Sequence, residues 1–203
     1  MVEKFSSADF WEKRYASGGN SGKGSYISAL RSFKNDVLLQ IIKANKIRSI
    51  IDWGCGDGHQ LQDLSFDGCY LGIDVSKTAV EKCRTIFDGR PNFSFIESME
   101  YLGQQASLGI SLDVIYHLVE DNVFEGYMER LCDSSMKYML IYSSNGRKVE
   151  KPAEHLLERN FIEWIENNRP EWKLQAIINN SFPYQGGKSN LESISDFYFF
   201  KRS

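Results

Sequence analysis

A glycine-rich turn at the end of a short apolar run constrains the fold of this chain more than any other feature. The run Ser49–Trp53 is a strand candidate, and Gly54, Gly56 and Gly58 follow it at alternate positions. Glycines at this spacing allow a tight turn, and they let the backbone approach a ligand with no Cβ in between. Asp52 stands near the end of the run. Because ligands bind at the carboxyl edge of the sheet in parallel α/β folds, we expect a binding site at this turn.

Two kinds of ligand compete for such a turn. A dinucleotide site has the spacing G-x-G-x-x-G and would need glycine at position 59, where this chain has His59. The spacing found instead, with Asp52 before it, gives the pattern D-x-G-x-G-x-G and an acidic rim. Such a rim suits a ligand with positive charge, such as the sulfonium and amino groups of S-adenosylmethionine (SAM), and it suits a pyrophosphate poorly. The turn therefore favours SAM.

A second carboxylate supports this interpretation. The strand candidate Tyr70–Ile73 is followed by Asp74, roughly 20 residues past the glycine turn, where an acid can accept hydrogen bonds from both hydroxyls of a ribose. The alternative is that Asp74 merely caps the helix that follows. On the first interpretation Asp52 and Asp74 contact different parts of one ligand.

The rest of the chain alternates between short apolar runs and amphipathic stretches. Further strand candidates are Phe93–Ile96, Leu112–Tyr116 and Tyr138–Tyr142, and helix candidates are Lys77–Phe87 and Asp121–Cys132. Strands and helices that alternate at this spacing predict a parallel sheet with helices on both faces.

The carboxyl-terminal part departs from that alternation. A helix is predicted over Glu154–Asn167, and the strand candidates Trp172–Ile178 and Ser195–Phe200 follow with no room for a full helix between them. Two strands joined by a loop usually lie antiparallel. We therefore expect an α/β fold with a sheet of seven strands, mostly parallel and with an antiparallel last strand.

The amino-terminal part, residues 1–45, is expected to pack on a core formed by residues 46–203. It contains an aromatic helix candidate, Asp9–Ala16, and a loop, Gly18–Ser25, whose glycines rule out regular structure. Tyr15 stands beside this loop. We expect the loop to act as a lid that closes over a ligand and excludes water, and a flexible linker is the alternative.

Composition excludes several other classes of protein. The net charge is −3 and the isoelectric point is near 5.7, whereas proteins that bind nucleic acid usually carry a basic surplus. No apolar run is long enough to span a membrane, and no secretory signal begins the chain, so we expect a cytoplasmic protein. The sequence indicates no oligomeric state. The cysteines form no C-x-x-C pair, so neither a disulfide framework nor a metal site is expected. These cysteines are Cys55, Cys69, Cys83 and Cys132.

Taken in order, these motifs resemble those of the class I SAM-dependent methyltransferases. Asp52–Gly58 is similar to their first motif, Gly72–Ser76 to their second and Leu112–His117 to their fourth, and the terminal strand pair resembles their reversed last strand. The resemblance implies a Rossmann-like fold, SAM as the cofactor, and transfer of a methyl group to an oxygen or nitrogen atom.

A narrower resemblance is to small bacterial methyltransferases that are often met near surface-polysaccharide genes. It is carried by Trp11, Arg14–Tyr15, Gly18–Gly22, Ser111–Asp121 and Tyr142–Asn145. Together with the mildly acidic composition, it favours a small molecule or a sugar as the methyl acceptor.

The resemblance also implies which residues bind the cofactor. The glycine turn should line its methionine part, with Asp52 bonding the ammonium, and Asp74 should hold the ribose. The residues after the third strand should border the adenine, with Glu97 and Ser98 as alternatives for its main contact. The full set is Tyr15, Asp52, Gly54, Cys55, Gly56, Asp74, Val75, Glu97, Ser98, Met99 and Asp113.

His117, just past the fourth strand, is the candidate catalytic residue. A histidine titrates near neutral pH, so it can take the proton from an acceptor hydroxyl as the methyl group transfers. The alternative is a histidine that only satisfies a backbone carbonyl. His117, Tyr142, Ser143 and Asn145 are predicted to bind the acceptor.

Two other functions stay open on the sequence alone. One is methylation of a nucleic acid or a protein. The other is a catalytically inactive, cofactor-binding partner subunit.

Overall fold

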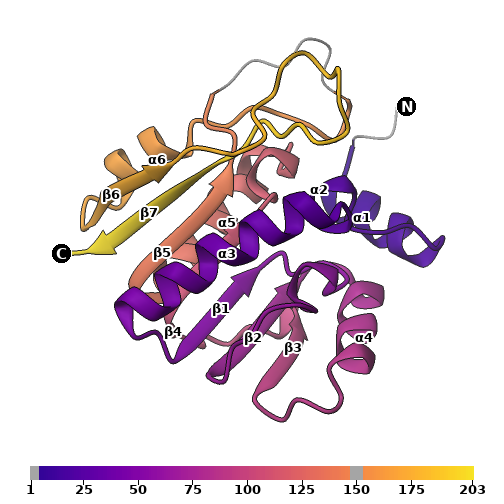
Figure 1. Ribbon diagram of the computed structural model, residues 1–203, viewed down its shortest axis with the longest axis horizontal. Helices are drawn as coiled ribbons and strands as arrows, with labels where there is room; N and C mark the ends of the chain where they lie inside the picture. The colour runs from indigo at the N-terminus through magenta and orange to yellow at the C-terminus, as the bar shows by residue number, and fades with distance from the viewer. Residues whose placement is uncertain (1–4, 147–152) are drawn as a thin grey trace.

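A seven-stranded sheet forms the centre of the computed structural model, which describes residues 5–146 and 153–203. Its strand order is β3-β2-β1-β4-β5-β7-β6 (Figure 1). Only β7 runs antiparallel to its neighbours, which are β5 and β6. This arrangement confirms the predicted fold class. The strands are β1 (Ser49–Trp53), β2 (Cys69–Asp74), β3 (Phe93–Glu97), β4 (Ala106–Leu112), β5 (Ser135–Ser143), β6 (Trp172–Ile178) and β7 (Asp196–Arg202).

The strand order reverses beside β1. The chain moves outward from β1 through β2 to β3 and then crosses back to place β4 on the other side of β1. The loops that leave the carboxyl ends of β1 and β4 therefore diverge and open a crevice, which is where ligands bind in sheets of this kind.

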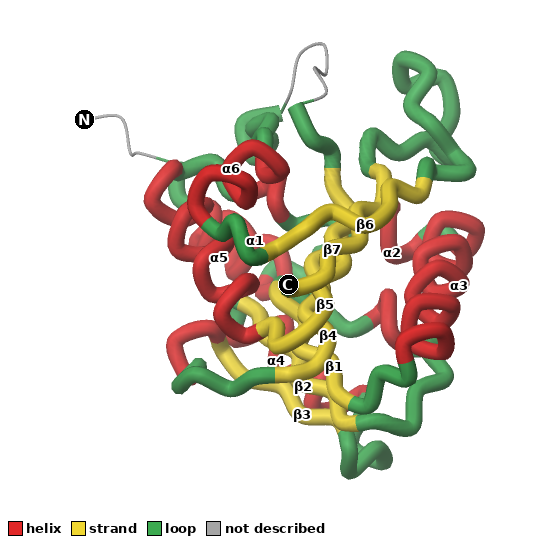
Figure 2. The backbone as a smooth tube through the Cα atoms, turned by 90° about the vertical axis from the view of Figure 1, so that its left-hand side faces the viewer, coloured by secondary structure: helices red, strands yellow, loops and turns green. Residues whose placement is uncertain are grey.

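Helices cover both faces of the sheet (Figure 2). α3 and α4 pack on one face, and α5 and α6 pack on the other. Along β1 the side chains alternate, so that Ile50 joins the first of these cores while Ile51 and Trp53 join the second. The helices are α1 (Ser7–Ala16), α2 (Lys23–Tyr26), α3 (Ser28–Asn45), α4 (Lys77–Ile86), α5 (Asp121–Ser134) and α6 (Phe161–Asn168), with short 3₁₀ turns η1 (His59–Leu61), η2 (Ser98–Glu100) and η3 (Ile115–His117).

The fourth strand lies earlier in the chain than predicted. β4 ends at Leu112, and Asp113 adopts a left-handed conformation with φ 61° that ends the extended backbone. The residues after it form η3. The prediction of a strand over Leu112–Tyr116 is therefore wrong. Small residues such as Gly109 alternate with larger apolar residues along β4, so the strand contains no continuous apolar run.

Two further predictions need correction. The helix predicted over Glu154–Asn167 begins only at Phe161, because the side chain of Asn160 caps it there by accepting from the Glu163 amide. The predicted loop Gly18–Ser25 also contains the start of the short helix α2.

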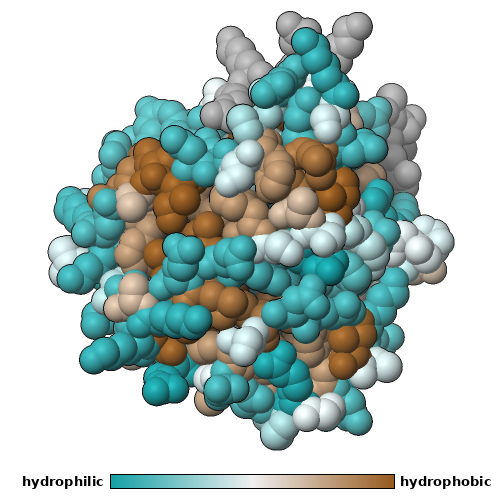
Figure 3. Space-filling view, viewed as in Figure 1, coloured by the Kyte–Doolittle hydropathy of each residue, from teal (hydrophilic) through white to brown (hydrophobic). Residues whose placement is uncertain are grey.

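The end of the sheet formed by β7 and β6 is less covered than its centre. Figure 3 shows hydrophobic surface in this region, beside α3. Residues 173–177 of β6 are exposed. In the ranges that the structure describes, no helix combines the length and the apolar character needed to cross a membrane.

Candidate active site

A cavity of about 410 Å³ lies at the carboxyl ends of β1, β2 and β4, at the point where the strand order reverses. Its volume is in the range of pockets for small molecules, roughly 300–1,000 Å³. Ser7, Ala8, Trp11 and Tyr15 of α1 form one wall. One face of α5 forms another, since Asn122, Gly126 and Arg130 recur at every fourth position and so lie on the same side of that helix.

The glycine turn lines the cavity and requires its glycines. Gly54 and Gly56 have φ of 82° and 58°, values that other residues adopt only with strain. A Cβ at Gly54 would lie 2.4 Å from Val114 Cγ2, and one at Gly56 would lie 2.4 Å from Ser21 Oγ. The turn is thus closely surrounded, and its bare backbone faces the space where a ligand can lie.

Asp74 holds the glycine turn and also lines the cavity. Its Oδ2 accepts from the Gly56 amide at 2.8 Å, and its Oδ1 accepts from the Ser76 amide at 2.9 Å. Ser76, not Asp74, is the capping residue of α4. Burial raises the pKa of the Asp74 carboxyl to about 6, against the lowering effect of these amide donors.

Asp52 is buried and lines the same cavity. The Tyr70 hydroxyl donates to its Oδ2 at 2.5 Å, whereas its Oδ1 has no hydrogen-bond partner among the described residues. Burial raises the pKa of Asp52 to about 7. A buried acceptor without a donor destabilises the protein, so Asp52 Oδ1 is suited to a donor supplied by a ligand.

Gln60 presents a second acceptor of this kind. Its Nε2 donates to the Arg31 carbonyl at 3.2 Å and to Asn35 Oδ1 at 2.8 Å, which directs the amide. Its Oε1 is buried and has no partner in the described part of the chain. Sequence analysis did not single out Gln60. Its position two residues after Gly58 was the feature of the sequence that could have identified it.

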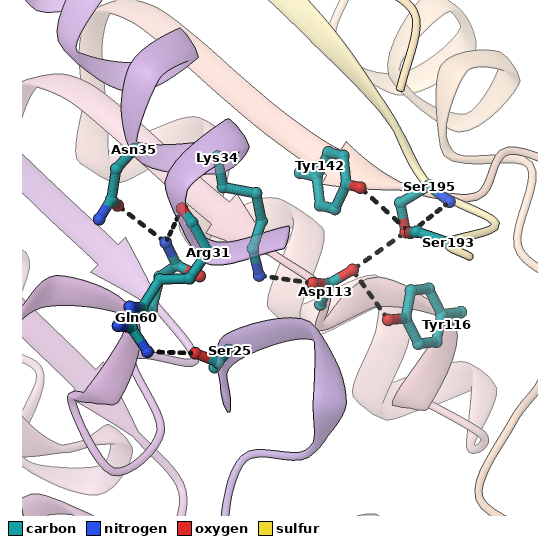
Figure 4. A network of polar contacts seen from close by, with 10 residues as sticks. All are labelled: Ser25, Arg31, Lys34, Asn35, Gln60, Asp113, Tyr116, Tyr142, Ser193 and Ser195. Carbon is teal, nitrogen blue, oxygen red and sulfur yellow. Dashed lines mark hydrogen bonds and ion pairs between the residues drawn. The ribbon is translucent and has the colours of Figure 1, made fainter. Parts of the chain in front are cut away.

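The carboxylate of Asp113 accepts hydrogen bonds from other side chains of the protein, as Figure 4 shows. Lys34 of α3, which is 1% exposed, donates to its Oδ2 at 2.8 Å. The hydroxyls of Tyr116 and Ser195 donate to its Oδ1 at 2.9 and 3.0 Å. Although Asp113 lines the cavity, these contacts connect α3, η3 and the approach to β7 at the end of β4.

The segment between α1 and α2 is fixed to the glycine turn by Asp57. Its carboxylate accepts from the Ser21 hydroxyl at 2.7 Å, from the Ser21 amide at 3.1 Å and from the Tyr26 hydroxyl at 2.9 Å. The Tyr15 hydroxyl lies 3.0 Å from Ser21 Oγ. Asp57 was not among the predicted site residues, although it stands inside the glycine turn.

α1 is attached to the core at both ends. In the middle of α1, Glu12 accepts from the hydroxyls of Ser76 and Thr78, each at 2.6 Å, and at its carboxyl end the Tyr15 carbonyl accepts from Lys82 at 3.1 Å. The bonds from the two hydroxyls lower the pKa of Glu12. At its amino end, Ser7 bonds the side chain of Glu120. The cavity is therefore lined by α1 as well as by Ser21 and Ser25 of the glycine-rich loop, which was expected to act as the lid.

His117 lies in η3 against the wall formed by α1. Its Nδ1 is 3.0 Å from the His155 carbonyl oxygen, and its ring packs edge-on against Trp11 at 4.9 Å. Burial lowers the pKa of His117 to about 4, so the imidazole is neutral near neutral pH and does not titrate there as expected from the sequence. His117 therefore bonds a backbone carbonyl, as the alternative interpretation expected, but it does so through only one of its two ring nitrogens.

The cavity brings together most of the predicted cofactor residues and the predicted base. It also brings residues that sequence analysis did not place in the site, among them Trp11, Tyr127 and Arg130. The predicted residues that line it are Tyr15, Asp52, Gly54, Cys55, Gly56, Asp74, Val75, Ser98, Asp113 and His117.

Other predicted site residues do not line the cavity. Met99 is 82% exposed, and Glu97 begins η2. Tyr142 packs in the core beneath α3 and donates its hydroxyl to Ser193 Oγ at 3.1 Å. Asn145 Oδ1 accepts from the Ile162 amide at 3.1 Å, next to the start of α6. Ser143 is fully buried in β5.

No protein-family model matches this chain, and no curated protein matches it in sequence. Solved structures do match it. Magnesium protoporphyrin IX methyltransferase (ChlM) from Synechocystis PCC 6803 with bound SAM superposes with a TM-score of 0.72 at 13% identity, over 100% of both chains. The N-methyltransferase NodS from Bradyrhizobium japonicum WM9, in complex with S-adenosyl-L-homocysteine (SAH), gives 0.72 at 12% identity, over 97% of this chain and 98% of that one.

The methyltransferase domain of bacterial CtHen1 gives a TM-score of 0.62 at 16% identity, over 83% of this chain and 97% of that domain. The chain thus has the Rossmann-like fold of these methyltransferases.

Proposed function

We propose that this protein is a SAM-dependent methyltransferase that acts on a small molecule or a sugar. The observation that carries the proposal is the cavity at the strand-order reversal. Bare glycine backbone and the carboxylates of Asp52 and Asp74 line it, and two of its lining residues, Asp52 and Gln60, each have a buried acceptor oxygen without a partner among the described residues.

The residues present fit this cofactor. Asp52 and Gln60 would accept hydrogen bonds from its ammonium group, and Gly54 and Gly56 would lie against its methionine part. Asp74 would hold the ribose, whose hydroxyls its carboxylate can accept. When bound, SAM supplies an electrophilic methyl group on a positively charged sulfur.

The remaining walls support a small, uncharged acceptor. Trp11, Val114 and Leu118 contribute apolar surface near His117. Arg130 is the only lysine or arginine that lines the cavity among the described residues, which gives little basis for recognising a phosphate chain. α1 covers the site, whereas a protein or nucleic-acid substrate would favour an open groove. Within the amino-terminal part, the stretch from Ser7 to Ser25 is thus proposed to enclose the acceptor.

His117 is proposed to act as the base for this acceptor. Its neutral imidazole can take a proton, and its neighbours fix the ring beside the cavity. Alignment of acceptor and methyl group is expected to supply much of the rate, because the sulfonium is already reactive.

Calorimetric titration with SAM, SAH and NAD tests the cofactor assignment. We expect both sulfur nucleosides to bind the wild-type protein, NAD not to bind, and Asp74→Ala to abolish binding. Tighter binding of NAD than of SAH would refute the proposal. Transfer of labelled methyl from SAM to extracts then tests the reaction. Binding without any transfer would favour the inactive partner subunit.

A further inference from the structure

A short segment, His155–Arg159, runs beside η3 and contacts it through the main chain. The Leu157 amide donates to the Tyr116 carbonyl at 2.9 Å. The His155 carbonyl oxygen lies 3.0 Å from Nδ1 of His117. We call this segment the strap. It replaces the first part of the helix that the sequence predicted, and its main-chain groups pair with η3 instead of with a helical turn.

Arg159 fixes the end of the strap to the residues that follow η3. Its Nε and one terminal nitrogen donate to the Leu118 carbonyl at 2.9 and 2.7 Å, and that terminal nitrogen also donates to the Val119 carbonyl at 2.8 Å. The other terminal nitrogen pairs with Asp121 at 2.6 Å. The Arg159 side chain is 11% exposed and that of Asp121 is 84% exposed, so the contacts to carbonyls carry most of the attachment.

The contact with the strap determines which nitrogen of His117 carries the proton. A carbonyl oxygen can only accept a hydrogen bond, so Nδ1 must carry hydrogen and donate it. In the neutral ring Nε2 is then left with its lone pair. No partner for Nε2 occurs in the part of the chain that the structure describes. Trp11 and His155 pack against the ring, with centroids 4.9 and 5.4 Å away, and limit its rotation.

We propose that Arg159 is a positioning residue that holds the strap against η3, so that His117 keeps hydrogen on Nδ1 and presents Nε2 to the methyl acceptor. The inference rests on the proposed function. It limits the acceptor to a group that carries a proton, a hydroxyl or an N–H. In the transfer, the acceptor atom forms a bond to the methyl carbon, the methyl–sulfur bond breaks with its electron pair on sulfur, and the acceptor proton passes to His117 Nε2.

The tautomer of His117 can be measured without knowing the acceptor. The chain contains three histidines, so ¹⁵N-histidine NMR of the SAH-saturated protein is simple to assign with His59→Asn and His155→Asn. We expect one tautomer for wild-type His117, with hydrogen on Nδ1. In Arg159→Met both tautomers should be populated, and Arg159→Lys should restore part of the preference.

Arg169→Met serves as the matched control, because Arg169 pairs with Asp133 at 3.3 Å in another part of the surface. It should leave the tautomer unchanged, as should Asp121→Asn. A purely structural role for Arg159 would lower the melting temperature without shifting the tautomer, and that result would overturn the inference. A wild-type His117 with hydrogen on Nε2 would overturn it as well, even if every Arg159 variant unfolds. Loss of the proposed function is recognised separately, by failure of SAH to bind.

Discussion

The two sides of the cavity are built in different ways. The side proposed to bind the cofactor comes from short stretches of chain that directly follow β1 and β2, and main-chain amides hold it together, as at Asp74. The side proposed to bind the acceptor is lined by residues of α1, η3 and α5, which lie far apart in the sequence, and the strap contacts η3 from outside the cavity lining. Local sequence therefore specifies the first side, whereas only packing specifies the second. The two sides should respond differently to mutation and to pH.

The largest effect is expected on the acceptor side. His117→Asn can still donate to the His155 carbonyl but cannot accept a proton there. We expect labelled-methyl transfer to fall by about 10²–10⁴-fold, while SAH affinity measured by calorimetry stays within about twofold. His59→Asn is the control and should retain transfer. Near-normal transfer by His117→Asn would show that no base is used.

A large effect on binding is expected on the cofactor side. Gly56→Ala combines a strained φ with a steric clash against Ser21 Oγ, and together they cost about 3 kcal/mol of free energy. If the turn must shift to relieve it, SAH affinity should fall by about a hundredfold. Gly89→Ala is a matched control, because no atom lies within 4 Å of its added Cβ. Equal affinities for the two variants would show that the turn does not contact the cofactor.

The pH response separates cofactor affinity from stability. Burial raises the pKa of Asp52 to about 7 and that of Asp74 to about 6. As pH falls through this range the carboxylates take up protons, so SAM affinity should decline by up to about tenfold per pH unit for each group. Calorimetry in buffers of different ionisation enthalpy should detect proton release on binding, and Asp52→Asn should reduce it.

The stability of the ligand-free protein should change in the opposite direction. The raised pKa values mean that the folded state binds more protons than the unfolded state between about pH 4 and 7. Their contribution to stability is therefore present at low pH and is lost as pH rises through 6 to 7. Thermal unfolding of wild type and Asp52→Asn over this range measures it. An affinity for SAM that is independent of pH would contradict the assignment of both carboxylates to the ligand.

The smallest effect is expected where the two sides meet. Glu12→Gln weakens the bonds of α1 to Ser76 and Thr78, and we expect the free energy of unfolding to fall by about 1 kcal/mol. Lys13→Gln, an exposed change in the same helix, should be neutral. A larger loss of SAH affinity than of stability would indicate that α1 also holds the cofactor.

The predicted bounds of helices and strands are wrong where packing against distant residues determines the structure. β1 and β6 have the predicted bounds, because apolar runs flanked by turn residues define them locally. β4 does not, since its Gly109 is required by a neighbour: a Cβ there would lie 1.8 Å from Ser135 Oγ. The strap was likewise predicted to be helical, but its main chain pairs with η3 and the helix begins only after the Asn160 cap.

The same distinction holds within the site. The position of Gly54, Gly56 and Asp74 at the cavity was predictable, because each follows a predicted strand at a fixed distance. Tyr142 and Asn145 were predicted to bind the acceptor but bond elsewhere, and no local pattern could have revealed their orientation.

The sequence by itself determined the order of strands and helices, the turn at β1 and the two acids at the carboxyl edge of the sheet. These depend on backbone conformation and on periodicity, which a short stretch of chain encodes. The tertiary structure decided which side chains enclose the cavity, which nitrogen of His117 carries hydrogen and how far burial shifts the pKa of Asp52. Those properties depend on distant segments of the chain, which exclude solvent from the site and supply its hydrogen-bond partners.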